Sequence, residues 1–285
     1  RTGQVLAMVS HPSYDPNLVD QDFGSLTRRR DGVLLNRATQ GRYPPGSTFK
    51  ILTLAMALQD GKVSMNDGIQ CNGALSLGSG RQIRCDEHHG VRAHGFIDST
   101  MAIAKSCNVS AATWALRVGY DDFTRYLDRL GVTTATGLPL SGERPGEYNR
   151  NEYAKKLQLA TFGFGQSITV TPLGLASAIS SIANGGVRMK PRLIQRIGGK
   201  ETPIESTERV FSVATCDGVL NCMQAVMDDA HGTGHKLRIP GYEMGGKTGT
   251  AQKIGPKTVG QKAYVSNFVG FVPAKNPQAV ILVMI

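Results

Sequence analysis

The sequence lacks any long apolar run, any internal repeat and any low-complexity linker. Its longest clean apolar stretch is Ala279–Ile285, which is far too short to cross a bilayer, so no membrane-spanning helix is expected within these residues. With 40% hydrophobic and 19% charged residues, the 285 residues are expected to fold as one large domain or two intimate subdomains with a substantial core.

Acidic residues are in the minority. The 22 Asp and Glu residues stand against 32 Lys and Arg residues, which gives a net charge of +10 and a pI of about 9.5. A basic balance is compatible with nucleic acid, an anionic membrane face or an acidic polymer as partner. The compact basic run Arg28–Arg30 is not accompanied by an aromatic-plus-basic motif of a nucleic-acid-binding fold. We therefore expect an evenly solvated basic surface and no nucleic-acid partner.

The five cysteines are an odd number, so at least one is free if the others pair. Cys71 and Cys85 lie in a Gly-rich polar stretch, with His88, His89 and His94 close behind. A disulfide closing this loop of about 15 residues would contribute roughly 3 kcal/mol in an oxidising compartment. A zinc site is a second interpretation, but the spacing does not match the usual C-x2-4-C pairs. Two unlinked thiols are the third. We favour the disulfide and expect no metal.

Strand-like segments cluster at the two ends of the chain, and helical patterns fill the middle. Ser47–Gln59 is apolar nearly all round and ends at Gly61, so it should be a buried central helix. The predicted fold is α/β (α+β type), with an antiparallel sheet built from both chain ends, flanking helices and an inserted all-helical lobe at roughly residues 62–200. The predicted strands are Gln4–Ser10, Lys247–Gln252, Tyr264–Val272 and Gln278–Ile285; the further predicted helices are Ser99–Lys105 capped by Asp98, a helix from Asn108 or Ser110 to Gly119, Asp121–Leu130, a helix opened by Thr171-Pro172, and Cys216–Ala230.

A serine and a lysine three residues apart open the predicted central helix. Ser47 follows two prolines and Gly46, a segment that fixes the approach of the chain and lets it turn tightly. Taken alone, Ser47 is a favoured helix cap. Lys50, however, lies on the same face one turn later, and its apolar neighbours on the helix would favour the neutral amine. Such a pair alone is most often structural, but together with the two motifs that follow it predicts a serine nucleophile and its lysine base.

A second triplet, Ser106-Cys107-Asn108, lies where one predicted helix ends and another begins. Its structural interpretation is again capping, with Asn108 starting the second helix. Its functional interpretation gives Ser106 a proton-relay role towards a leaving amine, and Asn108 hydrogen bonds to the substrate amide and to Lys50. Cys107 should point inward as a small apolar residue.

The third segment is Lys247-Thr248-Gly249-Thr250. Gly249 would leave space for an extended peptide to lie along an edge strand. Thr248 and Thr250 offer hydroxyls to a terminal carboxylate, supported by the charge of Lys247. The backbone N–H groups of Ser47 and Thr250 would form an oxyanion hole. We also expect the loop Gly232-Thr233-Gly234 to border the cleft.

Gly241–Thr248 formally fits the nucleotide-binding pattern G-x-x-x-x-G-K-T. A nucleotide-binding loop follows a buried apolar strand and opens a helix. Here the preceding segment is polar and ends in Pro240, and Gly249 follows at once with no helical pattern after it. We therefore reject nucleotide binding.

The three triplets S-x-x-K, S-x-N and K-T-G occur in the order known from β-lactamases and penicillin-binding proteins. With these residues in hand, the chain resembles the transpeptidase domain of penicillin-binding proteins, specifically the monofunctional class B type. The resemblance covers nearly the whole chain. It includes the opening segment RTGQVLAMVSHPSYDPN, then RYPPGSTFK, AHGFIDSTMAIAKSCN, TGLPLSGERPG, GFGQSITVTPL and KTGTAQ.

The resemblance implies a serine β-lactamase/transpeptidase-like fold and D,D-transpeptidation of peptidoglycan stem peptides through an acyl-enzyme on Ser47, without a metal or organic cofactor. It implies β-lactam antibiotics as inhibitors that acylate the same serine. It also implies a place in the cell envelope, outside the cytoplasmic membrane, and a membrane-embedded glycan polymerase as partner of parts outside this chain. Residues 1–285 would then be a single transpeptidase domain, an excerpt without the family's membrane anchor, pedestal and C-terminal helix.

The same chemistry serves hydrolases and sensors. Ser47 and Lys247 are 200 positions apart, longer than compact β-lactamases of classes A and D would allow. Glu147 and Asn151 match the pattern of a class A deacylating loop, but the preceding Gly142–Gly146 fits the transpeptidase pattern better, so Glu147 is taken as a loop carboxylate. A β-lactamase or D,D-carboxypeptidase, and a β-lactam sensor or scaffold without turnover, stay as alternatives.

Overall fold

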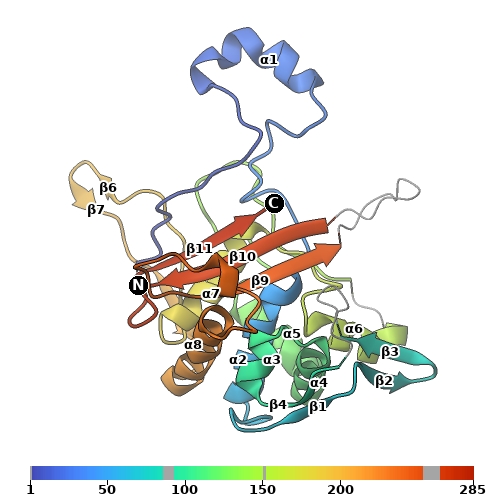
Figure 1. Cartoon of the computed structure of the whole chain (residues 1–285). Coiled ribbons are helices and arrows are strands. Elements are labelled where there is room, and N and C mark those ends of the chain that lie inside the picture. Colours follow the sequence, from blue (N-terminus) through green and yellow to red (C-terminus); the bar gives the residue numbers. More distant parts are fainter. Residues whose placement is uncertain (1, 86–92, 150–151, 253–263) are drawn as a thin grey trace.

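The computed structural model describes residues 2–85, 93–149, 152–252 and 264–285. Its sheet has three antiparallel strands in the order β11-β10-β9, with β9 spanning Gly245–Gln252, β10 Tyr264–Val272 and β11 Ala279–Met284 (Figure 1). The register pairs Asn267 of β10 with Gly249 of β9 and Phe268 with Val283 of β11. The three predicted C-terminal strands are thus confirmed, and so is the fold class.

The sheet is not built from both chain ends, because the predicted strand Gln4–Ser10 does not join it. The backbone there forms an isolated parallel bridge between Gln4 and Arg192, with the Val5 N–H donating to the Arg192 carbonyl over 3.0 Å. Leu6 and Val9 are 79% and 85% exposed. The apolar side chains of this segment are therefore not covered by other parts of the protein, and the segment does not form a strand of the sheet.

Helices of the middle segment form the core against which the sheet packs. The central helix α2 (Lys50–Gln59) is buried over almost its whole length, and it continues directly from the 3-10 turn η2 (Gly46–Phe49). α8 (Val213–Asp228) packs against α2 and β9, and α7 (Pro172–Ala183) packs against β11. The other helices are α3 (Ser99–Ala104), α4 (Asn108–Val118), α5 (Tyr120–Arg129) and α6 (Lys155–Phe162), with 3-10 turns η3 (Glu152–Ala154) and η4 (His235–Leu237).

Two of the predicted helix starts are confirmed by their caps. The Asp98 carboxylate accepts a hydrogen bond from the Met101 N–H, and the Thr171 hydroxyl accepts one from the Gly174 N–H. Each cap satisfies one of the N–H groups that have no partner within the helix. α4 differs, because neither Asn108 nor Ser110 caps it. The Cys107 sulfur takes that place instead, accepting from the Ser110 N–H.

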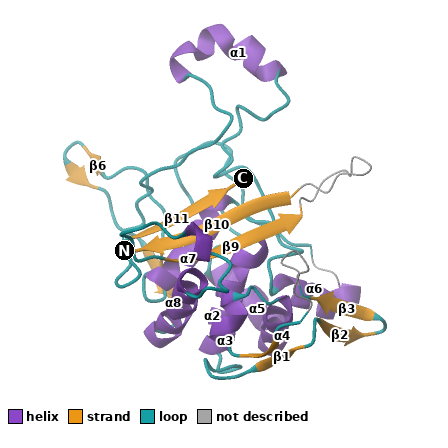
Figure 2. Ribbon diagram, viewed as in Figure 1, coloured by secondary structure: helices purple, strands orange, loops and turns teal. Residues whose placement is uncertain are grey.

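The lobe between α2 and α8 was predicted to be all helical, and this prediction is wrong. Its outer part holds two antiparallel ribbons, and two more pairs follow α7 (Figure 2). These short strands have few apolar residues in alternation, which is why their pattern did not stand out in the sequence. The pairs are β1 (Ile69–Cys71) with β4 (Gly95–Ile97), β2 (Ala74–Gly78) with β3 (Arg81–Arg84), β5 (Val187–Met189) with β8 (Ser206–Arg209), and β6 (Arg196–Ile197) with β7 (Lys200–Glu201).

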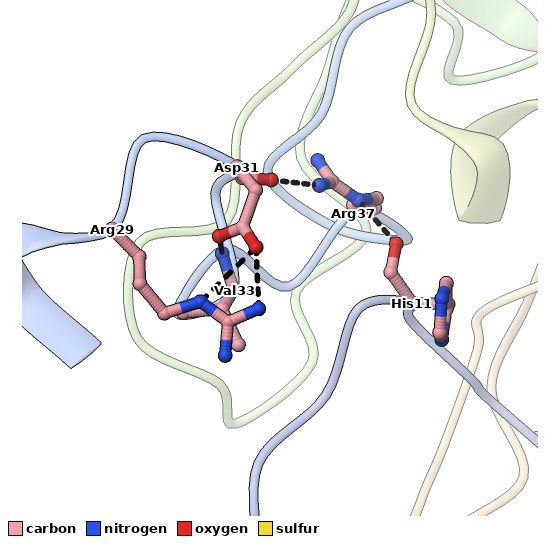
Figure 3. Close-up of polar contacts among 5 residues, drawn as sticks. All are labelled: His11, Arg29, Asp31, Val33 and Arg37. Carbon is pink, nitrogen blue, oxygen red and sulfur yellow. Dashed lines mark hydrogen bonds and ion pairs between the residues drawn. The ribbon is translucent and has the colours of Figure 1, made fainter. Parts of the chain in front are cut away.

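One helix stands apart from the rest. α1 (Val19–Arg28), preceded by the 3-10 turn η1 (Pro16–Leu18), projects away from the sheet on two connecting segments (Figure 1). Arg37 ties these segments together, donating from Nε to the His11 carbonyl over 2.9 Å and from a terminal nitrogen to the Asp31 carbonyl (Figure 3). The Asp31 carboxylate pairs with Arg29, whose hydrogen bond lowers the pKa of that carboxyl. Among the described residues, no helix has the length and apolar character needed to cross a membrane.

Candidate active site

The 3-10 turn η2 presents Ser47. In this turn residues three apart lie on the same side, and the Lys50 N–H donates to the Ser47 carbonyl, so the two predicted residues share one face at the start of α2. Ser47 is partly exposed, whereas Lys50 is completely buried. Ser47 therefore lies at an accessible point of the turn, whereas Lys50, directly after it, lies in the protein interior.

Glycines allow the turn before Ser47 to approach two other segments closely. Gly46 has a φ of 58°, and its N–H donates to the Gly165 carbonyl over 3.0 Å. A Cβ added to Gly165 would lie 2.2 Å from the Gly46 carbonyl oxygen, and one added to Gly46 would lie 3.0 Å from the Thr250 carbonyl oxygen. The Gly163–Gln166 segment and β9 thus hold the turn from two sides.

Three of the predicted residues meet at one hydroxyl. Lys50 Nζ lies 3.1 Å from Ser106 Oγ and 2.5 Å from the Ser106 carbonyl oxygen, and Lys247 Nζ lies 2.9 Å from the same Oγ. Both lysines are completely buried. Ser106 adopts a φ of 57° in the bend between α3 and α4, which turns its side chain and its carbonyl toward the lysines. Residues from α2, the α3–α4 bend and β9 therefore form one connected polar group in the core.

The other members of the second triplet hold the bend in place. Asn108 begins α4, and its side-chain amide donates to the Arg84 carbonyl over 3.2 Å, at the end of β3. Cys107 is completely buried, as predicted, and its sulfur caps α4. The Asn108 contact links the Ser106 bend to the ribbon that precedes it in the sequence.

β9 lies at the edge of the three-stranded sheet. It carries Thr248 and Thr250 and packs against the 3-10 turn η2. The Thr248 hydroxyl donates to the Thr233 hydroxyl over 2.8 Å, and the Thr233 N–H donates to the Ala104 carbonyl over 3.1 Å. The loop 232–234 therefore lies beside β9, and that it borders a cleft stays a prediction. Thr250 is exposed and Thr248 half-buried, so both hydroxyls lie where a ligand along β9 would reach them.

The space that a side chain at position 249 would occupy is already taken. The side chain of Asn267, its partner on β10, fills it: a Cβ added to Gly249 would lie 2.0 Å from Asn267 Oδ1. Asn267 Nδ2 donates to the Pro45 carbonyl over 2.9 Å, two residues before Ser47. Asn267 is thus a positioning residue that the sequence analysis missed. Its signal was a polar residue within the apolar strand 264–272.

The structure also bears on the predicted disulfide and on the predicted role of Glu147. Cys71 and Cys85 are both free thiols, so the disulfide that the sequence favoured is not formed. Glu147 forms an ion pair with Arg42, and its backbone pairs with Thr169, consistent with a loop carboxylate. Asn151, His88 and His89 lie outside the described residues.

Comparison with known proteins bears on the whole chain. The family described as "Penicillin binding protein transpeptidase domain" matches residues 1–285. "Stage V sporulation protein D" of Bacillus subtilis is 31% identical over 296 residues, and "Peptidoglycan D,D-transpeptidase FtsI" of Escherichia coli is 32% identical over 284 residues. Each alignment covers all of this chain but only 44% and 45% of the respective relative, so the chain spans less than half the length of these proteins.

Solved structures are also similar. The transpeptidase domain of penicillin-binding protein 3 from Burkholderia pseudomallei has a TM-score of 0.81 at 26% identity, covering all of this chain and 76% of that one. The D,D-transpeptidase domain of a peptidoglycan glycosyltransferase from Eggerthella lenta has a TM-score of 0.87 at 25% identity, covering 99% of this chain and 70% of that one.

Proposed function

The chain belongs to the penicillin-binding protein transpeptidase family, and from this premise we propose that it is a serine D,D-transpeptidase that cross-links peptidoglycan stem peptides. The observation that carries the proposal is the meeting of Lys50 and Lys247 at the Ser106 hydroxyl, with Lys50 directly after the turn that presents Ser47. The names of the aligned relatives, which include peptidoglycan D,D-transpeptidases, support the same reaction.

Acylation begins at Ser47. Its Oγ attacks the carbonyl carbon of the penultimate D-Ala of the donor stem, and the hydroxyl proton passes to the neutral amine of Lys50. Complete burial of that amine favours its neutral form and supports the role of base. The peptide C–N bond then breaks, and the leaving terminal D-Ala takes a proton through Ser106, which is hydrogen-bonded to both lysines.

The oxyanion of the tetrahedral intermediate accepts hydrogen bonds from the backbone N–H groups of Ser47 and Thr250. The close approach of the Gly46 turn to Thr250 supports this pairing of donors. Removal of one oxyanion donor in comparable sites costs roughly 10²–10³ in rate. In the second half-reaction, an amine of a neighbouring stem attacks the Ser47 ester, the C–O bond breaks, and Ser47 regains its proton.

The donor peptide lies along β9 in this proposal. Thr248 and Thr250 bind its terminal carboxylate, and Asn108 binds its amide. Lys247 is completely buried, so it acts on the carboxylate through its charge and through Ser106 rather than by direct contact. The Thr233 hydroxyl lies 2.8 Å from the Thr248 hydroxyl, and when Thr248 donates its proton to the carboxylate, Thr233 can donate to Thr248 and so set the orientation of that hydroxyl.

The biological setting is part of the proposal. A β-lactam mimics the donor and leaves Ser47 as a stable ester. The protein works in the cell envelope, on the outer side of the cytoplasmic membrane, where its substrate is. A membrane-embedded glycan polymerase is its partner, through parts of the parent protein outside this chain.

Intact-protein mass spectrometry after incubation with a penicillin, followed over hours, tests the proposal. We expect a long-lived adduct that is absent in Ser47→Ala and present in the matched control Ser206→Ala, whose serine is exposed on β8. An adduct that forms and clears quickly would indicate a β-lactamase. A stable adduct without turnover of a stem-peptide analogue would indicate a sensor or scaffold, and no adduct from folded protein would refute the site.

A further inference from the structure

Four side chains that the proposed reaction does not use converge beside the Ser106 bend. They are Cys71 at the end of β1, Cys85 directly after β3, His94 directly before β4, and Cys107 directly before α4. One ligand atom from each lies within 4.8 Å of all the others. We propose that these four residues form a structural zinc site that holds the bend carrying Ser106 and Asn108.

The distances between the ligand atoms match those of a tetrahedral site. With Zn–S about 2.3 Å and Zn–N about 2.0 Å, a tetrahedron has S···S edges of about 3.8 Å and S···N edges of about 3.5 Å. The Sγ atoms of Cys85 and Cys107 are 3.7 Å apart, and His94 Nδ1 lies 3.5 Å from Cys71 Sγ and 3.2 Å from Cys85 Sγ. A disulfide, by contrast, needs its sulfurs about 2.05 Å apart.

The donor set selects the metal. Three thiols and one imidazole are the soft ligands of structural zinc sites, and carboxylate-preferring ions such as Mg²⁺ and Ca²⁺ would not choose them. All three cysteines are buried and His94 is half-buried, so four protein ligands leave no open position for catalysis at the metal. The role that follows is structural.

Backbone contacts already bring the ligand segments together. The His94 N–H donates to the Cys71 carbonyl over 3.2 Å, and β1 pairs with β4 so that Cys71 lies opposite Gly95. The Ser110 N–H donates to Cys107 Sγ over 3.4 Å, an orienting contact of the kind that fixes metal-bound thiolates. The fold thus prearranges the four ligands before any metal binds.

The site lies next to catalytic groups. Cys107 stands between Ser106 and Asn108, and Asn108 also binds the carbonyl of Arg84, the residue before Cys85. Metal binding to Cys85 and Cys107 would therefore fasten the same two segments that Asn108 joins. This coupling to acylation rests on the proposed function, whereas the metal site itself does not.

Metal content measured on purified protein tests the site without reference to activity. We expect one zinc ion per chain by native mass spectrometry and elemental analysis, and loss of that ion in Cys85→Ser and in Cys107→Ala. Cys216→Ser and Cys222→Ser are matched controls, because both thiols are buried but outside the cluster, and they should keep full metal content. Ser47→Ala should also keep its zinc, which separates this test from the test of catalysis.

Unfolding of the unmodified protein provides a readout that does not depend on a variant folding. A strong chelator should lower the midpoint of thermal unfolding, and added Zn²⁺ should restore it, whereas Mg²⁺ should not. Cobalt(II) should give the charge-transfer absorption of thiolate ligands and the d–d bands of a tetrahedral site. Metal-free folded protein that binds no added Zn²⁺ would overturn the proposal, as would a Cys71–Cys85 disulfide found by peptide mapping.

Discussion

Substitutions of Gly249 and Asn267 should have non-additive effects on the free energy of unfolding, because the two residues are in contact. Asn267 lies opposite Gly249 in the sheet, is buried, and reaches across to the Pro45 carbonyl before the nucleophile turn. Gly249→Ala would place a Cβ 2.0 Å from Asn267 Oδ1, with Thr48 Cγ2 at 3.1 Å behind it. The side chain of Asn267 would have to move, and its hydrogen bond to Pro45 would be lost with it.

The magnitudes follow from these contacts. Overpacking of a buried site costs about 1–3 kcal/mol, so Gly249→Ala should lose that much unfolding free energy. Asn267→Ala removes one buried hydrogen bond, but the Pro45 carbonyl keeps the Thr48 hydroxyl as a donor at 2.8 Å, so its cost should be about 1–2 kcal/mol. In the double variant the clashing atoms are gone. Its loss should therefore be smaller than the sum of the single losses by about 1 kcal/mol or more.

Urea unfolding followed by circular dichroism measures these three losses. The second-order rate of penicillin acylation should fall in each variant, because the turn before Ser47 loses its anchor on the sheet. Gly24→Ala, on the exposed face of the projecting helix α1, is a control that should not lower either quantity. Strictly additive losses in the double variant would refute the steric argument.

Three further predictions concern other residues. Lys50→Ala should lower the acylation rate at least about 100-fold while the circular dichroism spectrum stays largely unchanged, and normal acylation would contradict its role as base. Thr233→Val removes the partner of the Thr248 hydroxyl and should lower the acylation rate constant roughly fivefold, the equivalent of about 1 kcal/mol. Burial and the hydrogen bond to Asp60 raise the pKa of Tyr126 above its ordinary value of 10.0, which stabilises the folded state below that pH and is lost as the pH rises further. Tyr126→Phe should therefore cost about 1–2 kcal/mol at neutral pH and flatten the alkaline fall in stability, and an unchanged alkaline limb in urea unfolding would count against this role.

The parts of the fold that the sequence predicted well are those whose signals are local. Asp98 and Thr171 mark helix starts through contacts three residues away, and the apolar run of Tyr264–Val272 has the same bounds in the structure as in the sequence. The segments containing Ser47 and Ser106 stand out as short motifs, although the contact between Lys50 and Ser106 joins distant parts of the chain. Such signals do not depend on the rest of the chain.

The features that the sequence did not predict, or predicted wrongly, depend on contacts with residues far away in the sequence. Asn267 matters only because Gly249 and Pro45 lie against it, and no local pattern reports that. Cys71, Cys85 and His94 lie in one stretch of the sequence, but their spacing did not favour zinc, and Cys107, the fourth ligand of the proposed site, comes from a separate segment. The opening segment Gln4–Ser10 alternates like a strand, but whether it joins a sheet depends on a neighbour that its own residues do not specify.

The meeting of Lys50, Ser106 and Lys247 has a consequence for how the protein matures. Ser106 lies 56 positions after Lys50 and 141 positions before Lys247, so the constellation depends on contacts of long sequence separation, which form slowly in folding. A growing chain carries Ser47, the proposed nucleophile, long before the strand that completes the site has been made. Labelling with a fluorescent penicillin should therefore report the completed fold, because a chain stopped before β9 contains Ser47 yet lacks a partner strand for the donor peptide.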